Sequence, residues 1–207
     1  LTESVIPQMP AKSQNERADR TRAQLIQAAE SLIVEKGFEN VSVREIVRKA
    51  GQKNESALQY HFKDRGGLIV ALKSRRSEQL EARRSALFTE FMQTNQNPDV
   101  RLICALLVQA PFQLCREDKE FRAYLGEFGQ RLIASNQIIT QVLSNRKSNS
   151  QSELTKLLRK LNRHLDDELF TLRLEAMSSF VLMSLSRRAR DKGSFRGRRA
   201  ELFISNL

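Results

Sequence analysis

Five polar side chains gather around a tight turn in the first third of the chain. They are Lys53, Asn54, Glu55, Ser56 and Gln59. Asn and Gln can pair bidentately with adenine, and Lys can donate a hydrogen bond to guanine. The cluster lies at the start of a short predicted helix, so it could contact the edges of base pairs. The alternative to this DNA-contacting role is that the segment is simply a polar surface helix between two core helices.

Two short helices and one longer helix would position these side chains. Apolar residues at helical spacing predict a first helix over about 18–36, which Gly37 ends. Ser42-Val43-Arg44-Glu45 has the pattern of a capping box, and it predicts a second helix that ends at Gly51. The third helix is predicted over about 55–62. Two short helices joined by a turn that contains Gly are typical of a helix-turn-helix, whose second helix enters the major groove of DNA.

The sequence of this region also resembles a known family. Residues 21–62 read TRAQLIQAAESLIVEKGFENVSVREIVRKAGQKNESALQYHF. Four short motifs form the matching set: EKGF at the end of the first helix, Ser42-Val43 at the start of the second, Ala50-Gly51 before the turn, and Tyr60-His61-Phe62 ahead of a charged turn. This set resembles the N-terminal domain of tetracycline-repressor (TetR) type regulators. With its continuation KDRGGLIVAL over residues 63–72, the resemblance covers about a quarter of the chain.

The resemblance implies contacts to DNA at matching positions. Ser42 and His61 would contact phosphates, as would Arg65 at the start of a fourth helix, and Arg44 would reach a base edge or a neighbouring phosphate. Tyr60 and Lys63 complete the predicted DNA-binding set, although Tyr60 and Phe62 are expected to fill the core. The turn QKNES is one residue longer than the family's commonest pattern, and Gln59 stands where a Tyr is usual.

The rest of the chain predicts an all-α protein, because apolar residues recur at helical spacing and strand-like alternation is nearly absent. Asp64 is placed to cap the long fourth helix, and Pro98 to occupy the first position of the next. Further helices are predicted near 99–116, 118–134, 136–146, 152–164 and 166–190, with a partial one in 195–207. Pro111 and a mobile loop over 144–152 are expected to separate some of them. The predicted division is a disordered lead at 1–16, a helix-turn-helix domain at 17–65, and a ligand-binding and dimerisation domain at 66–207.

Two groups of apolar residues are candidates for the functions that the resemblance implies for the second domain. It implies a homodimer formed by late helices and a site for a small-molecule effector, consistent with a repressor that binds a palindromic operator. The predicted dimer face consists of Leu172, Ala176, Ser179, Phe180 and Met183. The predicted pocket residues are Phe91, Leu106, Phe112, Tyr124 and Phe128. An ordinary core helix is the alternative for the first group, and ordinary core residues for the second.

Composition favours a polyanionic partner and excludes several classes of protein. The net charge is +11, from 35 basic and 24 acidic residues. Cys104 and Cys115 have no CxxC spacing, which argues against zinc and disulfides. No acidic pair, Ser/His/Asp set or phosphate-binding glycine loop indicates an enzyme, and no cofactor is expected. The absence of an 18-residue apolar run predicts a cytoplasmic protein with no membrane contact.

A basic run near the end of the chain supports a second hypothesis. It contains Arg187, Arg188, Arg190, Lys192, Arg196, Arg198 and Arg199. Residues 1–75 hold only 13 basic and 9 acidic residues, so most of the positive charge lies outside the predicted helix-turn-helix. A helical adaptor that binds an acidic protein or an anionic membrane through 187–199 is therefore the alternative function. A solvated or interface role for the run is favoured.

Overall fold

The computed structural model describes residues 11–95, 97–134 and 149–207, and every regular element in these ranges is a helix. The predicted all-α class is confirmed. The chain divides into two compact units, Leu1–Ser74 and Arg75–Leu207. This division falls inside a helix, nine residues after the predicted boundary at 65/66, and the assignment of functions to the two parts remains a prediction.

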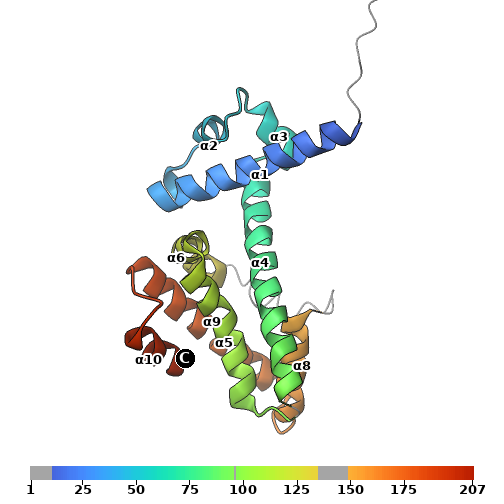
Figure 1. Ribbon diagram of the computed structural model, residues 1–207, viewed down its shortest axis with the longest axis vertical. Coiled ribbons are helices and arrows are strands. Elements are labelled where there is room, and N and C mark those ends of the chain that lie inside the picture. The colour runs from blue at the N-terminus through green and yellow to red at the C-terminus, as the bar shows by residue number, and fades with distance from the viewer. Residues whose placement is uncertain (1–10, 96, 135–148) are drawn as a thin grey trace, which may run out of the picture. The chain divides into compact units, whose positions relative to one another are not determined.

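Within its described residues, the first unit consists of three helices, a short 3₁₀ turn and the start of a fourth helix (Figure 1). They are α1 (Ala11–Lys36), η1 (Phe38–Asn40), α2 (Val43–Lys49), α3 (Ser56–Phe62) and the start of α4 (Arg65–Thr94). Leu25, Ile33, Ile46, Leu58 and Leu68 are almost completely buried and bring side chains from all four helices into one core. Burial of this apolar surface holds the short helices in place, because isolated seven-residue helices are unstable in water.

α1 begins earlier than the sequence predicted. The structure places its first residue at Ala11, whereas the prediction began near residue 18, so residues 11–16 of the predicted disordered lead are helical. The apolar stripe that predicted the helix starts only at Leu25, and the polar residues before it carry no periodic signal. The other part of the lead, residues 1–10, lies outside the described residues.

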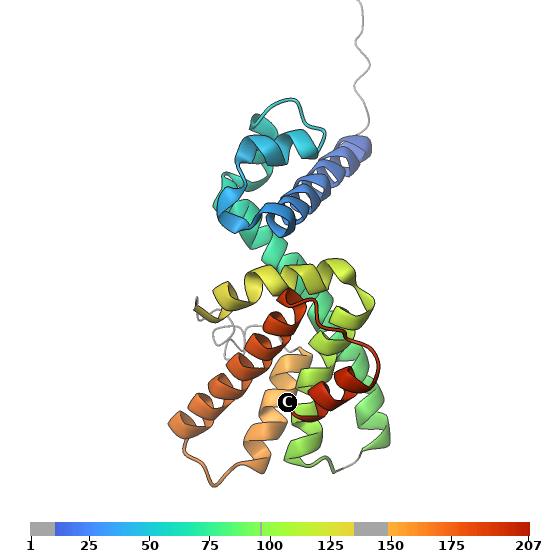
Figure 2. The ribbon, with the colours of Figure 1, turned by 90° about the vertical axis from the view of Figure 1, so that its left-hand side faces the viewer.

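Within its described residues, the second unit contains the rest of α4 and five further helices, which are labelled in Figure 1 and seen from another side in Figure 2. They are α5 (Val100–Glu117), α6 (Lys119–Ala134), α8 (Ser150–Leu161), α9 (Asp167–Arg190) and α10 (Arg198–Ser205). α9 packs most extensively against α6, while α5 contacts α6, α8, α9 and α10. α5 is therefore the central helix of this unit.

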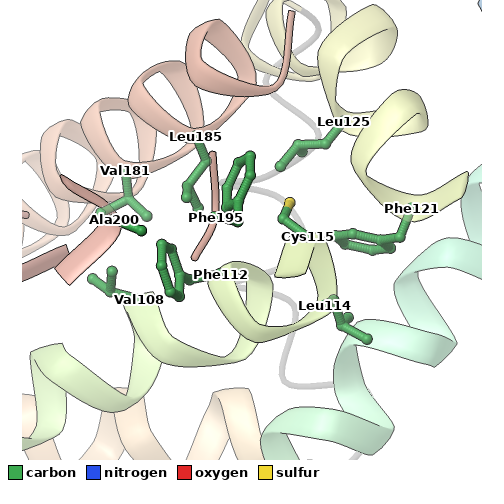
Figure 3. Close-up of a cluster of buried hydrophobic side chains, with 10 residues drawn as sticks. All are labelled: Val108, Phe112, Leu114, Cys115, Phe121, Leu125, Val181, Leu185, Phe195 and Ala200. Atoms are coloured by element: carbon green, nitrogen blue, oxygen red, sulfur yellow. The ribbon is translucent and has the colours of Figure 1, made fainter. Parts of the chain in front are cut away.

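Two buried clusters form the core of the second unit. In the first, Phe112 and Cys115 of α5 pack with Phe121 of α6, Leu185 of α9 and Phe195 before α10 (Figure 3). In the second, α5 packs against α8 and α9. Its buried members are Ile103, Leu106, Leu154, Leu158 and Leu174. Cys104 and Cys115 are free thiols, and burial raises the pKa of Cys115 to about 12, so Cys115 is an unreactive core residue.

α6 and α9 approach closely because α6 carries two glycines where it crosses α9. A Cβ atom on Gly129 would lie 2.4 Å from the Ser186 hydroxyl and 2.5 Å from its Cβ. A Cβ atom on Gly126 would have an ordinary contact, 3.4 Å from the backbone nitrogen of Arg190. The Gly126 carbonyl also accepts hydrogen bonds from the Arg190 guanidinium, from Nη2 at 3.2 Å. The crossing therefore requires glycine at position 129 in particular.

Three predictions about helix boundaries need correction or fall outside the described residues. Pro98 is not the first residue of α5, because the Asp99 side chain accepts a hydrogen bond from the Leu102 N–H at 2.8 Å and caps the helix. Pro111 does not separate helices; it lies buried within α5, between two buried neighbours. The predicted helix 136–146 and most of the loop 144–152 lie outside the described residues, and α8 begins at Ser150, within that loop.

The charged groups at the start of α6 connect three helices. The Arg76 side chain on α4 is 3% exposed, and its guanidinium lies 3.3 Å from Asp118 and 3.4 Å from Glu120. Asp118 also accepts hydrogen bonds from Gln79 at 2.7 Å and from the Phe121 N–H at 2.9 Å. These bonds lower the pKa of Asp118 against the opposing effect of its partial burial. The turn between α5 and α6 is thus fixed to α4.

Among the described residues, α9 is the one helix that is long and apolar enough by length and composition to cross a membrane, and 28% of its most apolar 18-residue stretch is buried. This single helix is weak evidence for a membrane span, since a core helix can pass the same test. Its apolar surface is divided between two sides. Leu174, Val181 and Leu185 face the interior, whereas Leu172, Phe180 and Met183 are exposed.

Candidate nucleic-acid interface

The start of α2 is fixed by the predicted capping box. The Ser42 hydroxyl accepts a hydrogen bond from the Glu45 N–H at 3.3 Å, and the Glu45 carboxylate accepts from the Ser42 N–H at 3.0 Å. Lys36 at the end of α1 donates to the same carboxylate at 2.6 Å. The hydrogen bond from Lys36, followed by those from Ser42, lowers the pKa of Glu45 to about 2. Ser42 and Arg44 are both exposed at this helix end.

The five predicted base-reading side chains are all exposed and belong to the turn before α3 and its first turns. Asn54 accepts a hydrogen bond from the Ser56 N–H at 3.0 Å through its side-chain oxygen. Its amide nitrogen remains the group that could donate outward. α3 begins at Ser56, one residue later than predicted, with Glu55 as the preceding residue. The structure therefore brings Lys53, Glu55 and Gln59 onto one short exposed segment.

The structure corrects the prediction that both Tyr60 and Phe62 fill the core. Phe62 is 8% exposed, but Tyr60 is 81% exposed. Leu58 and Phe62 are four residues apart and share the buried side of α3, which turns the intervening Tyr60 outward. The Tyr60 ring meets the His61 ring edge to face, with centroids 4.9 Å apart. Tyr60 is thus a large amphipathic side chain on the exposed surface of the helix-turn-helix.

His61 lies between the core and the exposed surface of α3. Partial burial lowers its pKa below the usual 6.5, and the nearby Arg22 guanidinium lowers it further, while Asp19 has the opposite effect. Arg22 also stacks on the Phe62 ring, with its Cζ 5.3 Å from the centroid. Its contact with α3 is a tertiary feature for which the sequence gives no local signal.

The two basic side chains that follow α3, Lys63 and Arg65, have different surroundings. Lys63 is exposed and has a positive φ of 68°, which ends the helix. Arg65 instead donates a hydrogen bond to the Phe38 carbonyl, and its Cζ lies 4.8 Å from the centre of the Phe38 ring. The Arg65 side chain therefore connects the start of α4 to η1.

Gly67 is a structural residue that sequence reasoning missed. A Cβ atom at this position would lie 2.0 Å from the Phe62 carbonyl oxygen, so only glycine allows α4 to start so close to the end of α3. The Gly67 N–H also donates to Asp64 at 2.8 Å, as expected for the predicted N-cap. The Gly66-Gly67 pair was the available signal, because two glycines at a helix start are costly unless the backbone needs them.

The predicted pocket residues of the second unit do not form one group. Leu106 and Phe91 belong to the cluster between α5, α8 and α9, whereas Phe112 belongs to the cluster around Phe195. Tyr124 and Phe128 stack on each other, with ring centroids 4.8 Å apart. The predicted dimer residues do share one region of α9, where Leu172, Phe180 and Met183 are each more than half exposed. Ala176 and Ser179 lie between them in the sequence.

The basic run near the end of the chain is divided between internal contacts and exposed charges. The Arg188 guanidinium lies 4.4 Å from the centre of the Phe203 ring and donates to the Ser194 carbonyl at 2.9 Å. Burial lowers the pKa of Arg188. Arg190 donates to α6, as described above. Arg187, Lys192, Arg196, Arg198 and Arg199 are exposed.

These helices match a known family. Residues 25–72 match the model of the bacterial regulatory proteins of the tetR family. The chain carries the N-terminal domain of the tetR family. The matched segment runs from within α1 into α4, so it contains the complete helix-turn-helix and its supporting core. The family predicted from the sequence is confirmed. No curated protein matches the sequence.

Solved structures extend the likeness in fold over most of the chain. A protein from Rhodococcus sp. assigned to the TetR-family transcriptional regulators has a TM-score of 0.59 at 17% identity, over 90% of this chain and 94% of that chain. RolR in complex with resorcinol has a TM-score of 0.48 at 19% identity, with 93% and 87% covered. A protein from Mesorhizobium loti MAFF303099, assigned to the same family, has a TM-score of 0.48 at 23% identity, with 90% and 91% covered. At these identities the likeness concerns the fold.

Proposed function

We propose that this chain is a cytoplasmic transcriptional regulator, rather than an enzyme, that binds double-stranded DNA through α2, α3 and the turn between them. The observation that supports this most directly is the exposed polar surface of α3, whose other side packs against α1 and the capped helix α2. Lys53, Asn54 and Gln59 would contact base edges, and Tyr60, His61 and Lys63 would contact the backbone. Ser42 and Arg44 would anchor the start of α2 on a neighbouring phosphate.

We further propose that the protein acts as a homodimeric repressor on a palindromic operator. A single short helix makes too few base contacts for tight specific binding, and a second copy doubles them. The exposed apolar residues of α9 support this proposal, since contiguous exposed apolar side chains mark interaction surfaces. A small-molecule effector would bind within the second unit. Binding there would change the spacing of the two reading helices.

The DNA-binding proposal is tested by fluorescence anisotropy with a labelled duplex from the region upstream of the protein's own gene. Lys53→Ala and Arg44→Ala should reduce the preference for this duplex over a scrambled one. Lys63→Ala should weaken binding to both duplexes and make the salt dependence shallower by about one phosphate contact. Lys160→Ala, an exposed lysine on α8, is the matched control. Equal binding of both duplexes by the unsubstituted protein would contradict the proposal.

The alternative, an adaptor that binds acidic partners through residues 187–199, is favoured by the exposed charges of Arg196, Arg198 and Arg199. It predicts that deletion of residues 1–62 leaves binding to anionic vesicles or to an acidic protein intact. The regulator predicts that Arg196→Ser, Arg198→Ser and Arg199→Ser together leave specific DNA binding unchanged. The two proposals therefore depend on different ends of the chain.

A further inference from the structure

The Arg84 side chain on α4 is charged and largely buried, and its hydrogen-bonding capacity is only partly used. The side chain is 11% exposed, and its Nη1 donates a hydrogen bond to Oε2 of Glu81 at 2.9 Å. Within the described residues, its buried Nε donates to no acceptor. Burial lowers the pKa of Arg84, and the Glu81 carboxylate opposes this effect. A buried guanidinium N–H is costly unless an acceptor reaches it.

The Glu81 carboxylate divides its hydrogen bonds between Arg84 and the start of α8. Its Oε1 accepts from both the N–H and the hydroxyl of Ser150, each at 2.6 Å. Only its Oε2 accepts from Arg84, through Nη1. In a guanidinium, Nε and one terminal nitrogen form an edge that pairs with a carboxylate through two parallel hydrogen bonds. The edge formed by Nε and Nη2 of Arg84 can therefore take a second anion.

The side of α4 that carries Arg84 is otherwise apolar. Leu80, four residues before Arg84, packs against the first of the two buried clusters, and Phe88, four residues after it, packs against the second. Residues at this spacing share one side of a helix. On α8, Leu154 is fully buried in the second cluster, four residues after Ser150. A molecule bound to Arg84 would therefore meet apolar side chains one turn further along both helices.

We propose that Arg84 anchors a small-molecule effector that carries one carboxylate on an apolar body. This inference rests on the effector proposed above and specifies its chemical class. The carboxylate would accept hydrogen bonds from Nε and Nη2 of Arg84, and the apolar body would extend along α4 toward Phe88. A carboxylic acid is ionised near neutral pH, so both hydrogen bonds are charge-assisted. The Glu81 carboxylate on the same guanidinium disfavours ligands of higher negative charge, such as phosphate esters.

The position of Arg84 connects this ligand to the link between α4 and α8 (Figure 1). α4 begins in the first unit, and Arg84 lies on its part in the second unit. A ligand carboxylate would share the guanidinium with Glu81, and two carboxylates on one guanidinium repel each other. Binding would therefore weaken the Arg84–Glu81 pair beside the Glu81–Ser150 hydrogen bonds that join α4 to α8.

The proposal is tested on the purified full chain with three probes, benzoate, cinnamate and octanoate, each compared with its neutral amide at equal ionic strength. At about ten times its dissociation constant, at least one acid should raise the melting temperature by about 3–5 °C, whereas its amide should not. By titration calorimetry, Arg84→Met should raise the dissociation constant of that acid about tenfold or more. Glu81→Gln should lower it, because the competing charge is removed. Arg101→Met, which changes an exposed arginine on α5, is the matched control.

The fold of each variant is checked by far-UV circular dichroism without ligand. Arg84→Lys keeps the charge but has no planar edge, so it should bind the acid with intermediate affinity. This variant also separates loss of the binding edge from loss of folding if Arg84→Met is unstable. An affinity for the acid that is the same in Arg84→Lys and in the unsubstituted protein would overturn the proposed two-bond contact.

The other outcomes overturn the proposal or separate it from the proposed function. If none of the three acids binds, or if each acid and its amide bind equally, Arg84 is not a carboxylate anchor, and the regulator stands with another class of effector. Unchanged binding by Arg84→Met has the same meaning. If an acid binds through Arg84 and leaves the anisotropy measurement with DNA unchanged, the anion site stands and its role as the effector site fails. Since calorimetry contains no DNA, a failure of specific DNA binding is detected independently.

Discussion

At the scale of single residues, the distinction between exposed and buried side chains on α3 decides which of them can meet a ligand. Phe62 and Tyr60 are both aromatic and only two positions apart, yet one fills the core and the other is 81% exposed. Composition alone predicted both to be buried, because large aromatics usually are. Arg65 is a basic side chain near the reading helix that was expected to meet phosphate; it contacts Phe38 within the chain, and its phosphate contact stays a prediction.

His61 allows a prediction about pH. Partial burial lowers its pKa in the free protein, whereas a nearby phosphate would raise it, so DNA binding should be accompanied by proton uptake. We expect affinity for DNA to increase as the pH falls from about 8 to 6 and expect His61→Gln to remove most of this dependence. His164→Gln, which changes an exposed histidine outside the first unit, should leave it intact. An identical pH profile for His61→Gln would exclude a phosphate contact by this residue.

The same shift affects stability. Since the pKa of His61 is lower in the folded protein than 6.5, the unfolded chain takes up a proton first as the pH falls. The contribution of His61 to stability is therefore complete above about pH 6.5 and decreases below it. Urea denaturation between pH 7.5 and 5 should show less loss of stability for His61→Gln than for the unsubstituted protein. Equal losses would indicate that His61 has the same pKa in both states.

At the scale of elements, local signals predicted helix starts well and missed contacts between helices. The sequence predicted the capping box at Ser42 and the cap at Asp64 because each depends on residues only three positions apart. Pro98 was misplaced because two capping signals compete there, and the Asp99 side chain accepts the decisive hydrogen bond. Gly129 is explained only by its contact with a neighbouring helix, which no local pattern in the sequence specifies, whereas the adjacent Gly66 was the one local signal for Gly67.

The α2 cap gives a prediction about stability and acid. Ser42→Ala should reduce the free energy of unfolding by about 1 kcal/mol, because the Glu45 N–H loses its acceptor. Since the pKa of Glu45 is lowered to about 2, its stabilising charge is fully present above about pH 4.5 and is lost as the pH falls toward 2. Denaturation curves of Glu45→Gln should therefore approach those of the unsubstituted protein over this range. Glu90→Gln, which changes an exposed residue on α4, is the control. If the free energy of unfolding of Glu45→Gln differs from that of the unsubstituted protein by the same amount at every pH, the account is contradicted.

The crossing of α6 and α9 gives a prediction about packing. Gly129→Ala should destabilise the protein by about 1–3 kcal/mol, because the new methyl group would lie 2.4 Å from the Ser186 hydroxyl. Gly126→Ala should cost much less, as its nearest contact would be 3.4 Å. In a Ser186→Gly background, Gly129→Ala should become neutral or stabilising, since alanine favours helix over glycine. Thermal melts of the four variants test this, and equal effects at positions 126 and 129 would contradict it.

At the scale of the whole molecule, the two units differ in what is known of them. The family match covers residues 25–72, so it identifies the helix-turn-helix and leaves the effector and partner to be inferred from the second unit. The sequence pattern anticipated the exposed region of α9 because its apolar residues recur at helical spacing. It did not anticipate that the five pocket candidates divide among separate groups, since periodicity gives the side of a helix and not its neighbour.

The central claim is that α3 reads DNA in a protein with two copies of this helix. Selection of binding sites from a pool of random duplexes by the purified full chain tests it most directly. We predict enrichment of an inverted repeat whose half-site centres are about 10–10.5 base pairs, or a multiple of this, apart. Lys53→Ala should relax the sequence within each half-site without changing this spacing. Recovery of no common sequence at moderate salt, or of a single unrepeated site, would contradict the claim.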